Sequence, residues 1–198
     1  MSVRLDKIIA AIDAVNARDP TSVEADGKLV PRALLYGKRM SAVLKTFMPN
    51  APEMLLIAAR AQHIERWSIP RASYPEGRIG YHNWRKNLQL HHAKLCGALM
   101  REAGYGTDDI EKVGALLRKE RLKYDPLTQT LEDVICLVFL QYEAPEFIAL
   151  HDDDKVRDIL TKTTRKMSPF GLAKAGMLTL DARLAKLLTE ALATRLAD

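Results

Sequence analysis

Apolar residues recur at helical spacing through most of this chain, and this periodicity constrains its fold more than any other feature. The first stripe consists of Leu5, Ile8, Ile9, Ile12 and Val15. Intervals of three and four residues place these side chains on one face of an α-helix. Val, Ile and Thr do not form alternating runs, and no segment convincingly predicts a strand. The sequence therefore predicts an all-α protein, a single compact domain of about eight helices over residues 1–198.

The composition is that of a soluble globular protein. The chain has 198 residues, of which 47% are hydrophobic and 28% charged, with a formal net charge of +5. This mildly basic balance favours an anionic ligand. Because the basic residues form no long tract and no aromatic residues are interleaved with them, a nucleic acid is an unlikely partner. Composition leaves the oligomeric state open.

Two cysteines, Cys96 and Cys136, lie in apolar helical segments. The N-terminus does not resemble a signal peptide, so we expect two reduced, buried thiols and a cytoplasmic location. The longest apolar runs, residues 54–59 and 134–140, are too short to span a bilayer. We therefore expect no association with a membrane.

A cluster of polar residues at the end of an apolar helix is the first candidate site. Asn50 and Glu53 have the spacing of a capping box, and the helix they open should end near Trp67, because Ile69 precedes a proline. His63 and Arg66 lie in its last turns. Such groups are costly to bury unless they are paired, liganded or used. For His63 alone, a structural and a functional role are equally open.

Two further helices supply possible partners for His63. On the helix over residues 80–103, His91 and His92 flank the apolar stripe, so at least one of them should face inward. Between the two helices, residues 68–79 form a loop long enough to act as a lid or binding loop. Asp133 is expected in the first turn of a helix capped by Thr130, where the helix dipole alone would account for a carboxylate.

Two histidines and an aspartate on separate helices are ligand types that a divalent metal prefers. His63, His92 and Asp133 are therefore the candidate metal ligands, and Mn, Mg, Fe and Zn are the candidate ions. If they bind one ion, their side chains should lie within about 5 Å of each other.

Basic residues in the same regions predict a phosphate-binding site. Arginine and lysine are the usual ligands of phosphate groups, and we expect several of them to converge on a phosphorylated small molecule. The alternative is that they form solvated faces with nearby acidic residues. No phosphate-binding glycine loop, dinucleotide fingerprint or H-E-x-x-H motif is present. The candidate substrate-binding residues are Arg66, Arg71, Lys119, Arg165 and Lys166.

Several segments together resemble a known family. They are residues 60–67 (RAQHIERW), 92–93, 131–134, 136–140 and 166–168. Histidine and aspartate ligands on separate helices resemble the HD-domain superfamily of metal-dependent phosphohydrolases, and the segments are more specifically similar to the domain-of-unknown-function 4202 family. The resemblance covers about residues 5–175. It implies an HD-like helical fold that binds a phosphorylated small molecule, such as a nucleotide, and hydrolyses it with a divalent metal.

The chain departs from the HD pattern in the ligands themselves. Gln62 and His63 stand where HD enzymes have adjacent His and Asp, and Arg39 lies near the place of their first histidine. A second function therefore stays open, that of a non-catalytic ligand sensor or protein-interaction module with a degenerate HD site.

Overall fold

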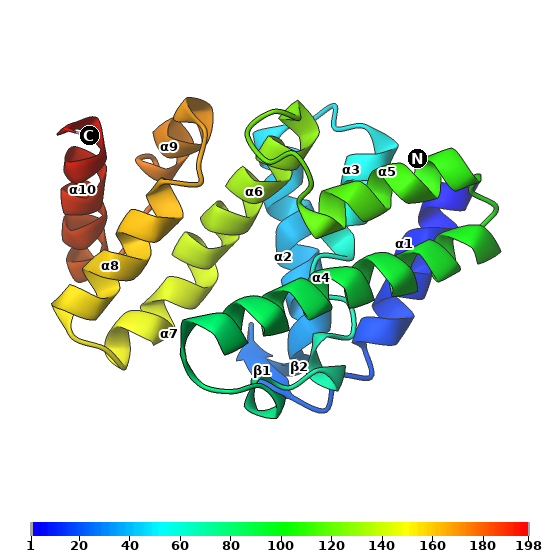
Figure 1. The fold of residues 1–198 in the computed structure, drawn as a ribbon, viewed down its shortest axis with the longest axis horizontal. Coiled ribbons are helices and arrows are strands. Elements are labelled where there is room, and N and C mark those ends of the chain that lie inside the picture. Colours follow the sequence, from blue (N-terminus) through cyan, green and yellow to red (C-terminus); the bar gives the residue numbers. More distant parts are fainter. Residues whose placement is uncertain (1, 198) are drawn as a thin grey trace. The chain divides into compact units, whose positions relative to one another are not determined.

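The computed structural model describes residues 2–197 and is built almost entirely of helices (Figure 1). Helices make up 71% of the chain and strands 4%, which confirms the all-α class. The described residues form ten α-helices, where about eight were predicted. They fold as two compact units, Met1–Glu120 and Arg121–Asp198. The single domain stays a prediction.

The first unit contains five α-helices, a β-hairpin and two short 3-10 turns. Its core is formed by fully buried aliphatic side chains that include Ile8, Ile12, Met40, Leu44 and Leu55. α4 packs along α5, and α3 contacts α1, α2 and α5. The elements are α1 (Val3–Asn16), β1 (Ser22–Ala25), β2 (Lys28–Pro31), α2 (Arg32–Phe47), α3 (Glu53–Arg60), η1 (Arg66–Ser68), η2 (Arg71–Ser73), α4 (Gly77–Glu102) and α5 (Thr107–Arg118).

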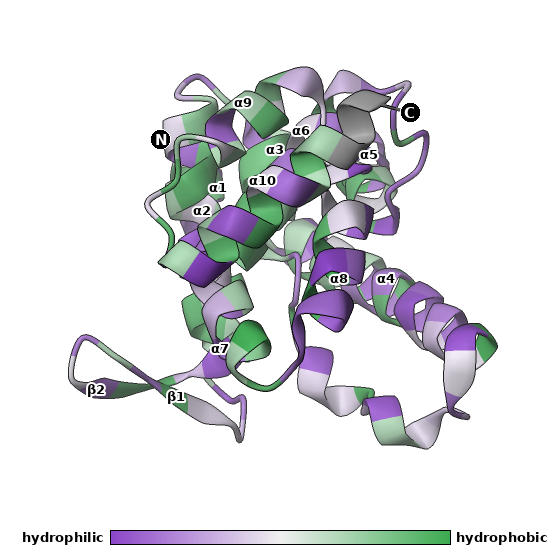
Figure 2. Ribbon diagram, turned by 90° about the vertical axis from the view of Figure 1, so that its left-hand side faces the viewer, coloured by the Kyte–Doolittle hydropathy of each residue, from purple (hydrophilic) through white to green (hydrophobic). Residues whose placement is uncertain are grey.

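The hairpin corrects the expectation that no segment forms a strand. β1 and β2 pair antiparallel, with Val23 opposite Val30. Asp26 and Gly27 connect them with φ angles of 52° and 71°. Two consecutive left-handed residues make the tight turn that Asp-Gly favours in hairpins. The hairpin projects from the start of α2 (Figure 2). β1 alternates exposed and half-buried residues, but over four residues only, and β2 does not alternate.

α3 ends at Arg60, seven residues before the predicted boundary at Trp67, and Asn50 does not cap it, since its N-cap residue is Pro52. Contacts with α1 and α2 fix this end. Arg60 forms a bidentate ion pair with Asp13, with both N–O distances 2.6 Å. A Cβ on Gly37 would lie 2.9 Å from the Arg60 carbonyl oxygen, so the glycine allows α2 to approach.

The loop predicted over residues 68–79 is shorter and more ordered than expected. The 3-10 turn η2 lies within it, and α4 begins at Gly77. The Arg71 guanidinium donates hydrogen bonds to the backbone oxygens of Tyr74 and Pro75, at 2.9 and 3.0 Å. Arg71 therefore stabilises the conformation of its own loop.

The second unit contains five α-helices and one π-helical turn. Asp125 caps α6 by accepting a hydrogen bond from the Thr128 N–H at 2.7 Å, so the predicted Thr130 cap is wrong. Asp133 consequently lies in the interior of α6 rather than in its first turn. The elements are α6 (Pro126–Val138), η3 (Phe139–Glu143), α7 (Ala144–Ala149), α8 (Asp153–Thr164), α9 (Pro169–Ala175) and α10 (Ala182–Ala197).

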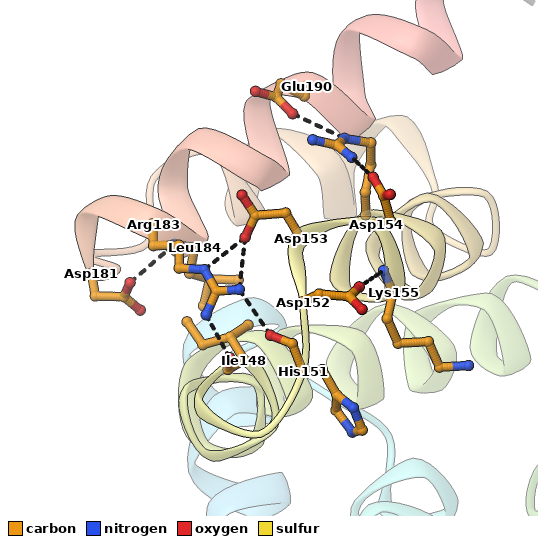
Figure 3. Close-up of polar contacts among 11 residues, drawn as sticks. Ile148, His151, Asp152, Asp153, Asp154, Lys155, Asp181, Arg183, Leu184 and Glu190 are labelled. Carbon is orange, nitrogen blue, oxygen red and sulfur yellow. Dashed lines mark hydrogen bonds and ion pairs between the residues drawn. The ribbon is translucent and has the colours of Figure 1, made fainter.

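Arg183 joins three helices of the second unit (Figure 3). Its guanidinium donates to the carbonyl oxygens of Ile148 and His151, at 2.6 and 2.8 Å, and to the carboxylate of Asp153 at 2.8 Å. Ile148 lies in the last turn of α7 and His151 just after it, and Asp153 is the first residue of α8. Arg183 therefore satisfies backbone groups that the end of a short helix leaves unpaired.

Cys96 and Cys136 form no disulfide and are both buried, as predicted. Among the described helices, none is both long and apolar enough to cross a membrane.

Candidate functional site

The structure brings His63 and His92 together within the first unit. His63 lies in the turn that follows α3, and His92 lies on α4, with 6.2 Å between their ring centroids. His92 is 2% exposed, whereas the side chain of His91 is 26% exposed. The prediction that one of the two adjacent histidines faces inward is confirmed.

Tyr36 on α2 forms a wall of this site that the sequence did not reveal. Its ring stacks on His63, with centroids 3.8 Å apart and an interplanar angle of 17°. Tyr36 is 6% exposed and belongs to the buried face of its helix. The only signal in the sequence is therefore its place on that face, which does not distinguish it from an ordinary core residue.

Both imidazoles are neutral at physiological pH. Desolvation by burial is the largest cause, and it lowers the pKa of His92 to about 3. It also holds the pKa of His63 well below its ordinary value. Burial disfavours the charged form of a histidine, and the positive charges of Arg66 and Arg85 lower both pKa values further. Lys119 adds to this effect at His63.

The site therefore combines two neutral histidines with three nearby cations. We call His63, His92, Arg66, Arg85 and Lys119 the histidine cluster. Arg66 and Lys119 were predicted from the sequence. Arg85 was not singled out; it lies one residue after Trp84 on α4, and its guanidinium donates a hydrogen bond to the Tyr81 hydroxyl at 3.4 Å. Lys119 is the C-cap residue of α5 and adopts a left-handed conformation with φ of 57°.

His92 and Gln62 hold buried polar atoms without hydrogen-bond partners. Neither ring nitrogen of His92 forms a hydrogen bond of normal geometry, and the same is true of Gln62 Oε1. The backbone carbonyl of Ile64 lies close enough to the His92 ring to raise its pKa slightly against the larger effect of burial. Most buried polar groups in proteins are paired, so such atoms require an explanation.

The first residue of the 3-10 turn η1 is anchored by aromatic contacts. The guanidinium carbon of Arg66 lies 4.6 Å from the ring centroid of Trp84. The indole N–H of Trp84 in turn donates to the carbonyl oxygen of Ile69 at 2.9 Å. This stacking holds the Arg66 side chain while its charge acts on the histidines.

Glu65 and His91 form a second polar pair beside the cluster. Glu65 has a left-handed backbone with φ of 50°, and its N–H donates to Asn16 Oδ1 at 3.2 Å. His91 Nε2 lies 3.0 Å from Glu65 Oε2 and 3.3 Å from Ser68 Oγ. Because carboxylate and hydroxyl share one ring nitrogen, they lack the arrangement of a catalytic triad, in which they occupy opposite nitrogens.

Asp133 lies in the second unit, where its carboxylate holds the start of α9. Oδ1 accepts hydrogen bonds from the N–H of Ser168 at 2.8 Å and from Gln129 Nε2 at 3.1 Å. Oδ2 accepts one from the Ser168 hydroxyl at 2.5 Å. These bonds give the 2%-exposed carboxylate a structural role. Its grouping with the two histidines stays a prediction.

The five predicted phosphate-binding residues have different environments. Arg66 and Lys119 act on the same histidine, while Arg71 binds carbonyl groups of its own loop. Arg165 and Lys166 are exposed residues of the second unit. Convergence of all five on one ligand stays a prediction.

The donor set of the first unit fits a metal only in part. Neutral imidazoles are good ligands for divalent transition metals, but catalytic sites usually supply three protein ligands. Across residues 2–197, no three His, Cys, Asp or Glu side chains are grouped so that they could hold an ion.

A model of the family described as "Domain of unknown function (DUF4202)" matches residues 6–188. The chain belongs to the DUF4202 family. No curated protein and no solved structure matches it. The family predicted from residues 60–67 and 131–140 is thus confirmed, while the likeness of this DUF4202 protein to HD-domain phosphohydrolases stays a prediction.

Proposed function

We propose that the first unit of this protein binds a phosphorylated small molecule, such as a nucleotide, at the histidine cluster. One observation supports the proposal above all others. The positive charges of Arg66 and Arg85 act on two neutral imidazoles, that of Lys119 acts on His63, and the buried ring nitrogens of His92 have no hydrogen bond of normal geometry.

An anion would offset the two unfavourable features of this arrangement. Its charge would balance Arg66 and Arg85, which act on both histidines, and Lys119, which acts on His63. Its oxygens would accept a hydrogen bond from the unpaired imidazole N–H of His92. Arginine and lysine bind phosphate through charge-assisted hydrogen bonds, each worth about 1.5–3 kcal/mol. The ligand and the cluster therefore have complementary charge.

Binding can be tested by calorimetry and thermal shift with a panel of nucleotides and sugar phosphates. Replacement of Arg66 by alanine should weaken binding about ten- to a hundredfold, because one charge-assisted contact is lost. Arg78→Ala is the control, since it removes the same charge from an exposed position at the start of α4 and should leave the affinity unchanged. If no phosphorylated compound binds, or if both variants behave alike, the proposal is wrong.

A second candidate function is metal-dependent hydrolysis of the same ligand by an HD-like fold. The neutral state of His63 and His92 favours it, because a metal binds the deprotonated imidazole nitrogen. The protein would use these histidines, together with a further ligand for which Asp133 is the candidate, and the metal would polarise the phosphoryl group.

Elemental analysis of the purified protein and phosphate release with Mn²⁺ or Mg²⁺ test this second function. A bound metal and turnover would support the hydrolase. Ligand-induced stabilisation without metal or turnover would instead favour the non-catalytic sensor.

A further inference from the structure

The histidine cluster offers a ligand more than positive charge. His92 carries two ring nitrogens in a side chain that is 2% exposed, and neither has a hydrogen-bond partner. A neutral imidazole has one N–H donor and one lone-pair acceptor. The position therefore presents one unmet donor and one unmet acceptor to whatever binds there.

Whichever ring nitrogen of His92 carries the hydrogen, the other nitrogen has a lone pair. Neither nitrogen has a partner. The nitrogen with the lone pair therefore needs a donor.

Gln62 repeats this requirement one residue before His63. Its side chain is 5% exposed, and its Oε1 atom has no donor. Arg60 and Arg66, the arginines on either side of this turn, have other contacts, with Asp13 and with the Trp84 ring. Gln62 Oε1 is thus a second buried acceptor without a donor in this part of the first unit.

A fully ionised phosphate can accept from the ring N–H of His92 but cannot donate to its lone pair, because phosphate oxygens only accept hydrogen bonds. A hydroxyl group can both donate and accept. We infer that the ligand of this site is a hydroxyl-bearing phosphate ester, whose phosphate faces the cations and whose hydroxyl donates to His92. The inference rests on the proposed phosphate-binding function and narrows it to sugar phosphates and ribonucleotides.

Calorimetry at pH 8, where phosphate monoesters are fully ionised, tests the hydroxyl requirement with matched ligands. Glycerol 3-phosphate and n-propyl phosphate have the same chain length and charge, and differ only in two hydroxyl groups. Ribose 5-phosphate tests a sugar phosphate, and AMP against 2′,3′-dideoxy-AMP tests a ribonucleotide. The hydroxylated member of a pair should bind about tenfold more tightly, because one hydrogen bond to a buried acceptor is gained.

The variants His92→Leu and Gln62→Met remove the acceptors and keep the cations. At least His92→Leu should reduce the ratio of the affinities for the hydroxylated and the non-hydroxylated ligand to about one. n-Propyl phosphate should still bind to this variant. Both variants delete buried polar atoms without partners, so they should fold. Thermal unfolding followed by circular dichroism checks this before binding is measured.

The outcomes separate this inference from the proposal on which it rests. If the esters bind equally with and without hydroxyl groups, or if His92→Leu keeps the preference, the hydroxyl requirement is wrong and phosphate binding stands. If no phosphate ester binds, both are wrong.

Discussion

Asp133 accepts hydrogen bonds from both the backbone N–H and the hydroxyl of Ser168, at 2.8 and 2.5 Å. The same hydroxyl oxygen accepts a hydrogen bond from the Gly171 N–H at 3.0 Å and so caps α9. The carboxylate thus fixes the residue that begins the helix. Three predictions concern the second unit, and one concerns the first.

Replacement of Gly171 by alanine should destabilise the second unit. A Cβ at this position would lie 2.6 Å from Asp133 Cγ and 2.7 Å from its Oδ1. The clash should cost about 1–3 kcal/mol of unfolding free energy, as overpacking does elsewhere. Amide hydrogen exchange of α6 and α9 would report the loss.

Gly176→Ala is the matched control for this substitution. The nearest atom to its added Cβ would be 3.6 Å away, and its φ of −66° suits alanine. It should be neutral or slightly stabilising, because alanine restricts the unfolded chain. Equal effects of the two substitutions would contradict the close contact between Gly171 and Asp133.

Asp133→Asn distinguishes the structural role of the carboxylate from a role as a metal ligand. Asparagine has one acceptor oxygen instead of two, so it cannot accept from both groups of Ser168 in the same way. We expect protection of α9 from hydrogen exchange to fall by about 1–3 kcal/mol, the cost of leaving a buried group unpaired. Loss of bound metal with unchanged protection of α9 would instead assign the residue to the metal.

Arg183→Lys should weaken the junction of α7, α8 and α10. The guanidinium satisfies three acceptors at once, and a lysine ammonium cannot reproduce this planar geometry. About 1 kcal/mol of unfolding free energy should be lost, with faster exchange at the end of α7. Arg183 is partly exposed, so added salt should change this result little if the two carbonyl contacts dominate. A strong salt dependence would show that the Asp153 ion pair matters more.

Acid should destabilise the first unit through His92. Its pKa is about 3 in the folded state against 6.5 ordinarily, so the unfolded state binds more protons between these values. Stability is therefore complete above pH 6.5 and falls by about 1.4 kcal/mol for each pH unit below it, until the folded pKa is reached. The lowered pKa of His63 acts in the same direction.

Urea unfolding at pH 7.5 and pH 5.0 measures this effect. Both tryptophans, Trp67 and Trp84, belong to the first unit, so their fluorescence reports on it. Between pH 7.5 and pH 5.0 the free energy of unfolding of the wild type should fall by about 2 kcal/mol more than that of His92→Leu. Parallel losses in the two proteins would show that His92 is not buried in its neutral form.

Local sequence patterns were sufficient to predict the helices and the inward orientation of one of the two adjacent histidines on α4. The stripe from Leu5 to Val15 predicted α1, and Gly104 after α4 has the left-handed φ of 90° that helix ends favour. The spacing of α4 showed that His91 or His92 must face inward. Each of these features depends on residues within a few turns of one another, where helical geometry fixes the outcome.

The same patterns failed where distant residues act. Asn50 and Thr130 satisfy the local rules for a helix cap, but α3 and α6 begin elsewhere, the latter because Asp125 and Pro126 form a better start. The turn of Asp26 and Gly27 was visible in the sequence, yet the strands beside it have four residues each, too few to predict a hairpin from their periodicity. Local propensity is a weak guide when neighbouring elements compete for the same backbone.

The sequence by itself determined that this protein is helical, that it belongs to the DUF4202 family, and that His63, His92 and Arg66 are candidate site residues. Only the tertiary structure showed that Tyr36 stacks on His63 and that the charge of Arg85 lowers the pKa of that histidine. It also showed that Arg71 donates to a carbonyl of its own loop and that Asp133 accepts a hydrogen bond from Ser168. The physical reason is that the burial of a side chain and the charges around it depend on residues that lie far from it in the sequence. The pKa of His92 depends on how α4 packs against the turn after α3 and on cations from other elements, and no spacing along the chain specifies those distances.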